Sequence, residues 1–175
     1  MEDIEFRRLT ILDEKAYHQY IDEFLKANER IIPTAIYDPD LSFSEWLERS
    51  HNIEKGKTLP EKWVPATSYF LLRKSDGKIL GALDLRHELN DHLLKYGGHI
   101  GYGVAPSERQ KGYASYMLSA ALPICKSLGI TNVLITCNKE NLGSARTIQK
   151  NGGVLENEVT YDGVTRQRYW INLTP

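Results

Sequence analysis

Apolar residues recur at helical spacing in the first third of the chain. From Asp13 onward they follow the spacing of one buried helix face, and Asp13 is the expected N-cap of this first helix. A second helix is expected to begin at Ser42, because Ser42 and Glu45 have the spacing of a capping box, and to end at Gly56. A short alternating stretch at residues 4–10 predicts a strand before both helices.

The rest of the chain is dominated by strand-forming runs that end in turn residues. Asp-Gly pairs at residues 76–77 and 162–163 are strong signals for hairpins. Residues 57–65 contain two prolines and predict a loop, whereas residues 89–96 fit either a loop or a short helix. Strands are expected at residues 67–74, 78–86, 98–105, 132–137, 154–161 and 164–173, and helices at 112–128 and 142–151. This order of elements indicates a mixed α/β sheet in one domain, residues 1–175.

The composition argues against several classes of protein. Lysine and arginine number 22 and aspartate and glutamate 23, so the formal net charge at pH 7 is −1. This balance argues against a protein that binds nucleic acid or an anionic membrane. No apolar run approaches the roughly 20 residues of a membrane helix, and the acidic start does not resemble a signal peptide. With only two cysteines in the chain, we expect a cytoplasmic protein without disulfides.

The most informative segment joins the strand at residues 98–105 to the helix that follows. The strand stops at Pro106, a polar loop comes next, and the helix begins near Gly112. A helix start exposes free N–H groups with partial positive charge, which favours a phosphate, and Arg109 and Lys111 add charge there. The lysine and hydroxyl pair of a P-loop is absent after Gly112. Taken alone, the pattern also fits an ordinary basic helix start.

Three ordered motifs carry a resemblance to a known family. RQKGYA at residues 109–114 resembles the Arg/Gln-x-x-Gly-x-Gly/Ala signature of the GNAT superfamily of acyl-CoA N-acyltransferases. NLGS at 141–144 and KNGG at 150–153 resemble the helix and the turn that follow in that family. The resemblance covers residues 67–173 and implies an acetyl-CoA-binding core there, with a strand and acceptor-side helices in residues 1–65. It implies a mostly antiparallel sheet, splayed at a bulge and flanked by helices.

The resemblance also implies acetyl-CoA as cosubstrate, without a metal. In the family, the backbone of the central strand holds the pantetheine arm, and the loop and helix start hold the pyrophosphate. The residues that it implies for the cofactor site are Gly103, Val104, Ala105, Arg109, Gln110, Lys111, Gly112, Tyr113, Ala114, Ser115, Asn141 and Ser144. Gly101 and Gly103 are residues suited to the bulge at which the sheet would splay.

Acetyl transfer to an amine needs a base, because an amine with a pKa of ~10.4 is almost fully charged at pH 7. Many relatives carry a glutamate where this chain has His99, so His99 is a candidate base, with a structural histidine as the alternative. Asp84 and Glu88 are further candidates for the base, directly or through water. The resemblance assigns the backbone N–H of Val104 to the oxyanion.

The chain departs from the family pattern at the general acid. Relatives commonly place a tyrosine seven residues after the asparagine, and that position is Ile148 here. Either the thiolate leaves without a proton donor, or Ser144 supplies the proton.

The expected activity is N-acetylation of a small-molecule or peptide amine by direct transfer in a ternary complex. Acceptor contacts are expected from Trp63, Asp84, Arg86 and His87. Acceptor specificity is expected to lie in residues 1–65 and in the loop at 86–98. A catalytically silent CoA-binding or sensing domain of the same fold is the alternative, because Ile148 replaces the tyrosine. The sequence leaves a homodimer open.

Overall fold

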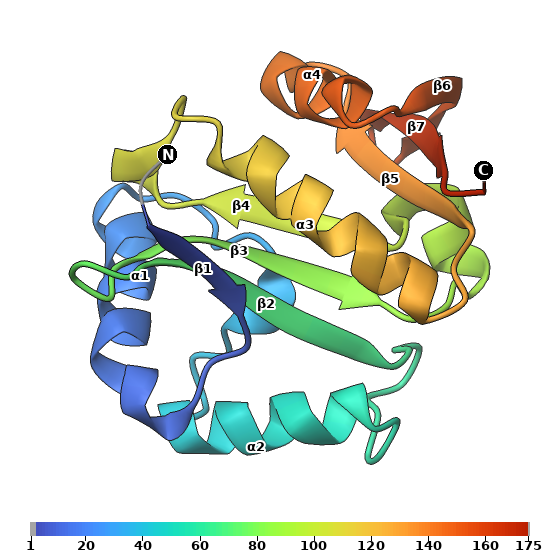
Figure 1. Cartoon of the computed structure of the whole chain (residues 1–175). Helices are drawn as coiled ribbons and strands as arrows, with labels where there is room; N and C mark the ends of the chain where they lie inside the picture. Colours follow the sequence, from blue (N-terminus) through green and yellow to red (C-terminus); the bar gives the residue numbers. More distant parts are fainter. Residues whose placement is uncertain (1–2, 175) are drawn as a thin grey trace.

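Two antiparallel sheets that meet edge to edge form the centre of the molecule (Figure 1). The computed structural model describes residues 3–174. The first sheet contains, in spatial order, β1 (Ile4–Arg7), β2 (Ala66–Arg73), β3 (Ile79–Arg86) and β4 (Ile100–Val104). The second contains β5 (Asn132–Asn138), β7 (Val164–Asn172) and β6 (Val154–Tyr161), again in spatial order. The predicted mixed, mostly antiparallel architecture is confirmed.

The strands β2 and β3 are buried on both faces, and this produces two apolar cores. Successive residues of a strand point to opposite faces. Leu71 belongs to the core that is closed by Met117, whereas Phe70 belongs to the core that is closed by Phe24 and Trp46. The helices that close these cores are α3 (Tyr113–Ser127) on one face and α1 (Glu14–Lys26) with α2 (Phe43–Glu54) on the other. The last helix, α4 (Leu142–Lys150), packs beside α3.

The two sheets separate between β4 and β5. The His99 N–H donates to the carbonyl of Leu134 at 2.7 Å, and Gly98 forms a single bridge with Ile135. In return, the Leu134 N–H donates to Nδ1 of the His99 imidazole at 3.0 Å. An imidazole nitrogen therefore replaces the next carbonyl of the ladder, and the residues of β4 beyond this point belong to a different sheet from β5. We call this gap between the strands the split.

The split is present, but Gly101 and Gly103 do not form the expected bulge. The register between β3 and β4 is regular along the whole of β4. Gly103 is required for another reason, because a Cβ at this position would lie 2.2 Å from the carbonyl oxygen of Ile32. The chain around Ile32 thus crosses directly over β4.

Both predicted N-cap positions are confirmed, but only one has a capping side chain. Ser42 and Glu45 form the predicted capping box. Asp13 is the N-cap residue of α1, but its side chain makes no capping hydrogen bond to the helix, because its carboxylate accepts hydrogen bonds from the guanidinium of Arg7, at 2.8 and 2.9 Å, and from the N–H of Thr10 at 2.7 Å. Thr10 and Asp13 instead form a capping box around a 3-10 turn that leads into α1.

Residues 89–96, for which the sequence fits either a loop or a short helix, overlap a π-helical turn, Leu93–Gly97. Within residues 3–174, no helix is long and apolar enough to cross a membrane. In the same part of the chain, no group of three His, Cys, Asp or Glu side chains could hold a metal ion.

Candidate active site

The loop before α3 presents backbone amides to open space. Gln110 and Gly112 both adopt left-handed conformations, with φ of 63° and 85°. Such turns direct successive N–H groups to one side and form an anion-binding concavity. Among the described residues, the amides of Lys111, Gly112, Ala114 and Ser115 donate to no backbone carbonyl. A Cβ at Gly112 would meet no described atom within 4 Å. We call this loop and helix start, residues 109–115, the amide cup.

The cationic side chains of the amide cup are already paired with carboxylates. Arg109 donates to Glu29 at 3.0 Å, and Lys111 donates to Glu108 at 2.8 Å. Glu108 is only 4% exposed and also accepts from Lys78 at 3.0 Å. Burial raises the pKa of Glu108, but the hydrogen bonds from Lys111 and Lys78 outweigh it and hold that pKa below its usual range. Attraction for an anion therefore comes mainly from the amides and the helix dipole.

The backbone of β4 divides its hydrogen-bonding groups between β3 and the split. Ala105 donates its N–H to Leu80 at 2.9 Å, and Arg86 donates to the carbonyl of His99 at 2.8 Å. Because backbone groups of a strand alternate in direction, residues 101, 103 and 105 face β3, as does the carbonyl of His99. The backbone groups of Val104 face the split. Of the three β4 residues expected to offer backbone groups to the cofactor, Val104 faces the split, whereas Gly103 and the Ala105 N–H pair with β3.

A pair of hydroxyl groups connects the two sides of the split. The Tyr102 hydroxyl on β4 lies 2.7 Å from Oγ of Ser144 on α4. Burial raises the pKa of Tyr102 to about 12, so this hydroxyl stays protonated at neutral pH. Sequence analysis missed Tyr102 because its partner lies 42 residues further along the chain. Ile148 is fully buried in the core beneath α4.

Two other residues proposed for the cofactor have structural partners. The Asn141 side chain accepts the N–H of Ser144 at 3.1 Å and thereby caps α4. The Ser115 hydroxyl accepts a hydrogen bond from Asn151 at 3.1 Å, which ties the first turn of α3 to the end of α4. The split and the amide cup are thus held together by α4.

His99 occupies a position that favours the structural alternative. The residue is 6% exposed, and its Nδ1 lone pair accepts the Leu134 N–H. Burial, together with the nearby charge of Arg86, lowers the pKa of His99 to about 4. The ring is therefore neutral at pH 7 with its proton on Nε2, and its accepting nitrogen is already occupied. His99 also does not line the large cavity described next.

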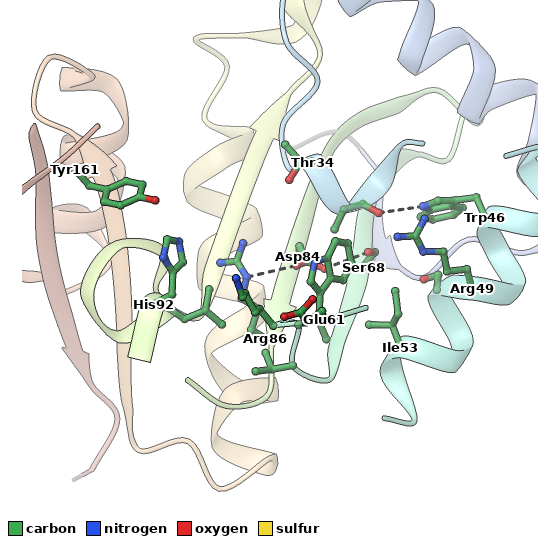
Figure 2. A pocket seen from close by; sticks show the side chains of 17 residues that line it. Thr34, Trp46, Arg49, Ile53, Glu61, Ser68, Asp84, Arg86, His92 and Tyr161 are labelled. Carbon is green, nitrogen blue, oxygen red and sulfur yellow. Dashed lines mark hydrogen bonds and ion pairs between the residues drawn. The ribbon is translucent and has the colours of Figure 1, made fainter. Parts of the chain in front are cut away.

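A cavity of about 660 Å³ opens beside β2 and β3, on the side of the sheet that carries α2 (Figure 2). Three of the four expected acceptor residues line it: Trp63, Asp84 and Arg86. His87 does not, because its imidazole Nε2 lies 2.8 Å from the hydroxyl of Thr67. The remaining lining residues are Thr34, Ala35, Trp46, Arg49, Ser50, Ile53, Glu61, Lys62, Val64, Ala66, Ser68, His92, Leu93 and Tyr161.

Asp84 forms the polar floor of this cavity. Its side chain is 3% exposed, accepts a hydrogen bond from the Ser68 hydroxyl at 3.2 Å and lies 3.9 Å from Nε of Arg86. Burial raises the pKa of Asp84, and Arg86 and Ser68 oppose this only in part. A buried carboxylate with a raised pKa is a competent proton acceptor. Glu88, the other acidic candidate, is exposed and does not line the cavity.

Two antiparallel sheets that part beside an amide cup are the architecture that the sequence resemblance implies for an acyl-CoA N-acyltransferase. Residues 3–154 match the family model of the acetyltransferase (GNAT) domain. The chain therefore belongs to the GNAT acetyltransferase family.

Solved acetyltransferases have a similar fold. The ribosomal-protein-S5-alanine acetyltransferase from Vibrio fischeri is 17% identical, with a TM-score of 0.74 over 100% of this chain and 97% of that one. An N-acetyltransferase from Staphylococcus aureus Mu50 is 17% identical, with a TM-score of 0.67 over 98% and 99%. The protein yncA from Salmonella typhimurium, solved with its cofactor acetyl-CoA, is 13% identical, with a TM-score of 0.65 over 98% and 94%. No curated protein matches the sequence significantly.

The position of His99 predicts a pH-dependent stability. A histidine whose folded pKa is about 4, against 6.5 when unfolded, stabilises the fold above pH 6.5 and loses that contribution as the pH falls towards 4. Between pH 7 and pH 4.5 the wild type should lose about 2 kcal/mol more than His99→Asn, whose amide oxygen accepts the same N–H without titrating. Urea unfolding at pH 7 and pH 4.5 measures this difference. Equal losses in both proteins, with turnover reduced over 100-fold in the variant, would instead support a base.

A substitution in the amide cup should affect CoA binding far more than a substitution with the same effect on stability elsewhere. Gly112 and Gly129 lie at opposite ends of α3, and both have positive φ (85° and 78°) and open space around the Cβ position. Gly112→Glu and Gly129→Glu should therefore lower the free energy of unfolding by similar amounts, about 1 kcal/mol each. Only Gly112→Glu should abolish CoA binding in calorimetry, because it adds negative charge to the cup. If Gly112→Glu kept its affinity for CoA, the diphosphate would have to bind outside the amide cup.

Proposed function

We propose that the protein transfers an acetyl group from acetyl-CoA to a primary amine by direct attack in a ternary complex. The observation that carries this proposal is the register between β3 and β4, which pairs Asp84 with Gly101. The carboxylate at the floor of the cavity therefore lies one strand from the backbone that borders the split. An amine in the cavity and a thioester in the split would meet at β4.

The described residues fit the CoA cosubstrate. The amides of the amide cup would hold the diphosphate, and the Val104 carbonyl, which faces the split, would accept a hydrogen bond from the pantetheine arm. Asn141 and Ser115 would contribute by fixing α4 and the first turn of α3, through their hydrogen bonds to Ser144 and Asn151. Arg109 and Lys111 would adjust the charge at the rim, since both are paired with carboxylates.

Asp84 would take the proton from the ammonium of the acceptor. An amine with a pKa of ~10.4 is neutral for only about one molecule in 10³ at pH 7, so a nearby base removes a large part of the barrier. The amine nitrogen then bonds to the acetyl carbon, and the Val104 N–H stabilises the oxyanion. When the carbon–sulfur bond breaks, the Ser144 hydroxyl gives its proton to the thiolate, and the nitrogen loses its second proton to Asp84, which has by then released the first to water. Tyr102 can return a proton to Ser144 through their hydrogen bond and regain its own from water.

Acetyl-CoA and a panel of primary amines test the proposed activity. A thiol reagent should report release of free CoA only when an amine is present, and mass spectrometry should find the amine heavier by one acetyl group. Gly112→Glu is the matched control and should be inactive. Thermal stabilisation by CoA without thiol release from any amine would support the catalytically silent domain instead.

The burial of Asp84 predicts opposite effects of one substitution on activity and stability. Asp84→Asn should lower kcat by about 10²- to 10⁴-fold, because no base remains, while CoA affinity is unchanged. A folded pKa raised above the unfolded value of ~3.9 means that ionisation destabilises the fold as the pH rises past that value. Asp84→Asn should thus melt at a higher temperature than the wild type at pH 8, and the difference should vanish near pH 4.

The exposed Glu88, at the end of the same strand, provides the control. Glu88→Gln should retain the wild-type kcat and the wild-type melting temperature at both pH values. If Glu88→Gln lost activity and Asp84→Asn did not, Glu88 would be the base.

A further inference from the structure

The cavity is built for one ammonium group attached to a flat apolar body. We propose that the acceptor is an aromatic monoamine, a proposal that rests on the function proposed above. The cavity places a single buried carboxylate between two aromatic walls and offers no second buried carboxylate to another ammonium.

One wall is formed by Trp63 from the loop that precedes β2. Trp63 lines the cavity and is 41% exposed, so much of its ring is not covered by protein. The guanidinium of Arg49 lies 5.4 Å from the ring centroid and is held by Asp38 at 2.5 Å. The indole is thus fixed in position, and Ile53 and Val64 continue the apolar surface beside it.

The opposite wall comes from the tip of the β6–β7 hairpin. Tyr161 is 47% exposed, lines the cavity, and lies 4.6 Å from Tyr96 and 5.6 Å from His92 between ring centroids. Figure 2 shows Tyr161 and His92 at one end of the cavity and Trp46 and Arg49 at the other. An aromatic body would gain area and favourable ring contacts at these walls.

This second wall is held in place before any ligand arrives. Arg168 donates to the carbonyl of Leu94 at 2.7 Å, and Thr136 donates to the carbonyl of Tyr96 at 3.0 Å. Both contacts fix the π-helical turn Leu93–Gly97 on the second sheet, beneath the ring of Tyr161. A preformed wall costs little ordering entropy on binding, which favours a rigid ligand.

The charges of the cavity favour a monoamine over a polyamine. The lining cations are Arg49, Lys62 and Arg86, and the lining carboxylates are Glu61 and Asp84, while Asp38 pairs with Arg49 from outside the lining. Of the two lining carboxylates, only Asp84 is buried. One ammonium can pair with Asp84, but a second finds no other buried carboxylate in the cavity.

Calorimetry on the CoA-saturated protein tests the proposed ligand class without requiring turnover. The probes are 2-phenylethylamine, n-butylamine and spermidine. We expect 2-phenylethylamine to bind about 10- to 100-fold more tightly than either of the others, because it alone combines one charge with a ring. Equal affinity for n-butylamine, or tighter binding of spermidine, would overturn the inference.

Two variants and a control locate the binding site of the ring. Trp63→Leu and Tyr161→Leu should each weaken 2-phenylethylamine about tenfold and weaken n-butylamine less. Val164 pairs with Tyr161 across the hairpin but does not line the cavity, so Val164→Ala should bind all three amines like the wild type. Unchanged affinity of both aromatic variants for 2-phenylethylamine would also overturn the inference.

Turnover of the same amines distinguishes the two proposals. Tight binding of 2-phenylethylamine without release of CoA thiol would refute acetyl transfer and leave the ligand class supported. Acetylation of spermidine in preference to 2-phenylethylamine would support acetyl transfer and refute the ligand class.

Discussion

The hydrogen bond between the Leu134 amide and the His99 imidazole ends the pairing of β4 with β5. A backbone carbonyl in that position would continue the ladder, and the two sheets would join into one. The imidazole satisfies the buried Leu134 amide without extending the ladder. Both proposed substrate sites depend on this contact, because the split exists only where pairing stops. A proton on Nδ1 of His99 would remove the acceptor of the Leu134 amide. Burial lowers the pKa of His99 and so keeps this nitrogen unprotonated.

Once the split exists, the hydrogen-bonding groups on its edges need partners. The backbone of Val104 has none in β3, and the amides of the cup at Gly112 and Ala114 donate to no carbonyl in the described chain. Water can hydrogen-bond to these groups. An extended ligand with alternating amides and a terminal diphosphate would match both the split and the amide cup at once. Recognition is then carried by backbone geometry, which is consistent with the pairing of Arg109 and Lys111 to carboxylates elsewhere.

Local signals in the sequence were sufficient for the elements and for the amide cup. The Ser42 capping box and the glycine at 112 act within a few residues, so neighbouring positions determine them. The position of Asp13 at the start of α1 was predicted, but the pairing of its carboxylate with Arg7 was not. The role of His99 depends on Leu134, 35 residues away. Of the two aromatic walls, Trp63 was expected at the acceptor site, but its combination with Tyr161 could not be predicted. Their residues come from a helix, two loops and a distant hairpin, and no spacing along the chain connects them.

The floor of the cavity shows how reactivity and stability oppose each other in this fold. Water would stabilise an ionised Asp84 better than the single hydroxyl of Ser68 and a guanidinium 3.9 Å away can. This incomplete compensation raises the pKa and makes the carboxylate a better proton acceptor, and it also weakens the folded state. The strands β2 and β3 tolerate the cost because apolar cores cover both of their faces. A second buried carboxylate would add a further cost of the same kind, which is a physical reason for a cavity that serves one ammonium.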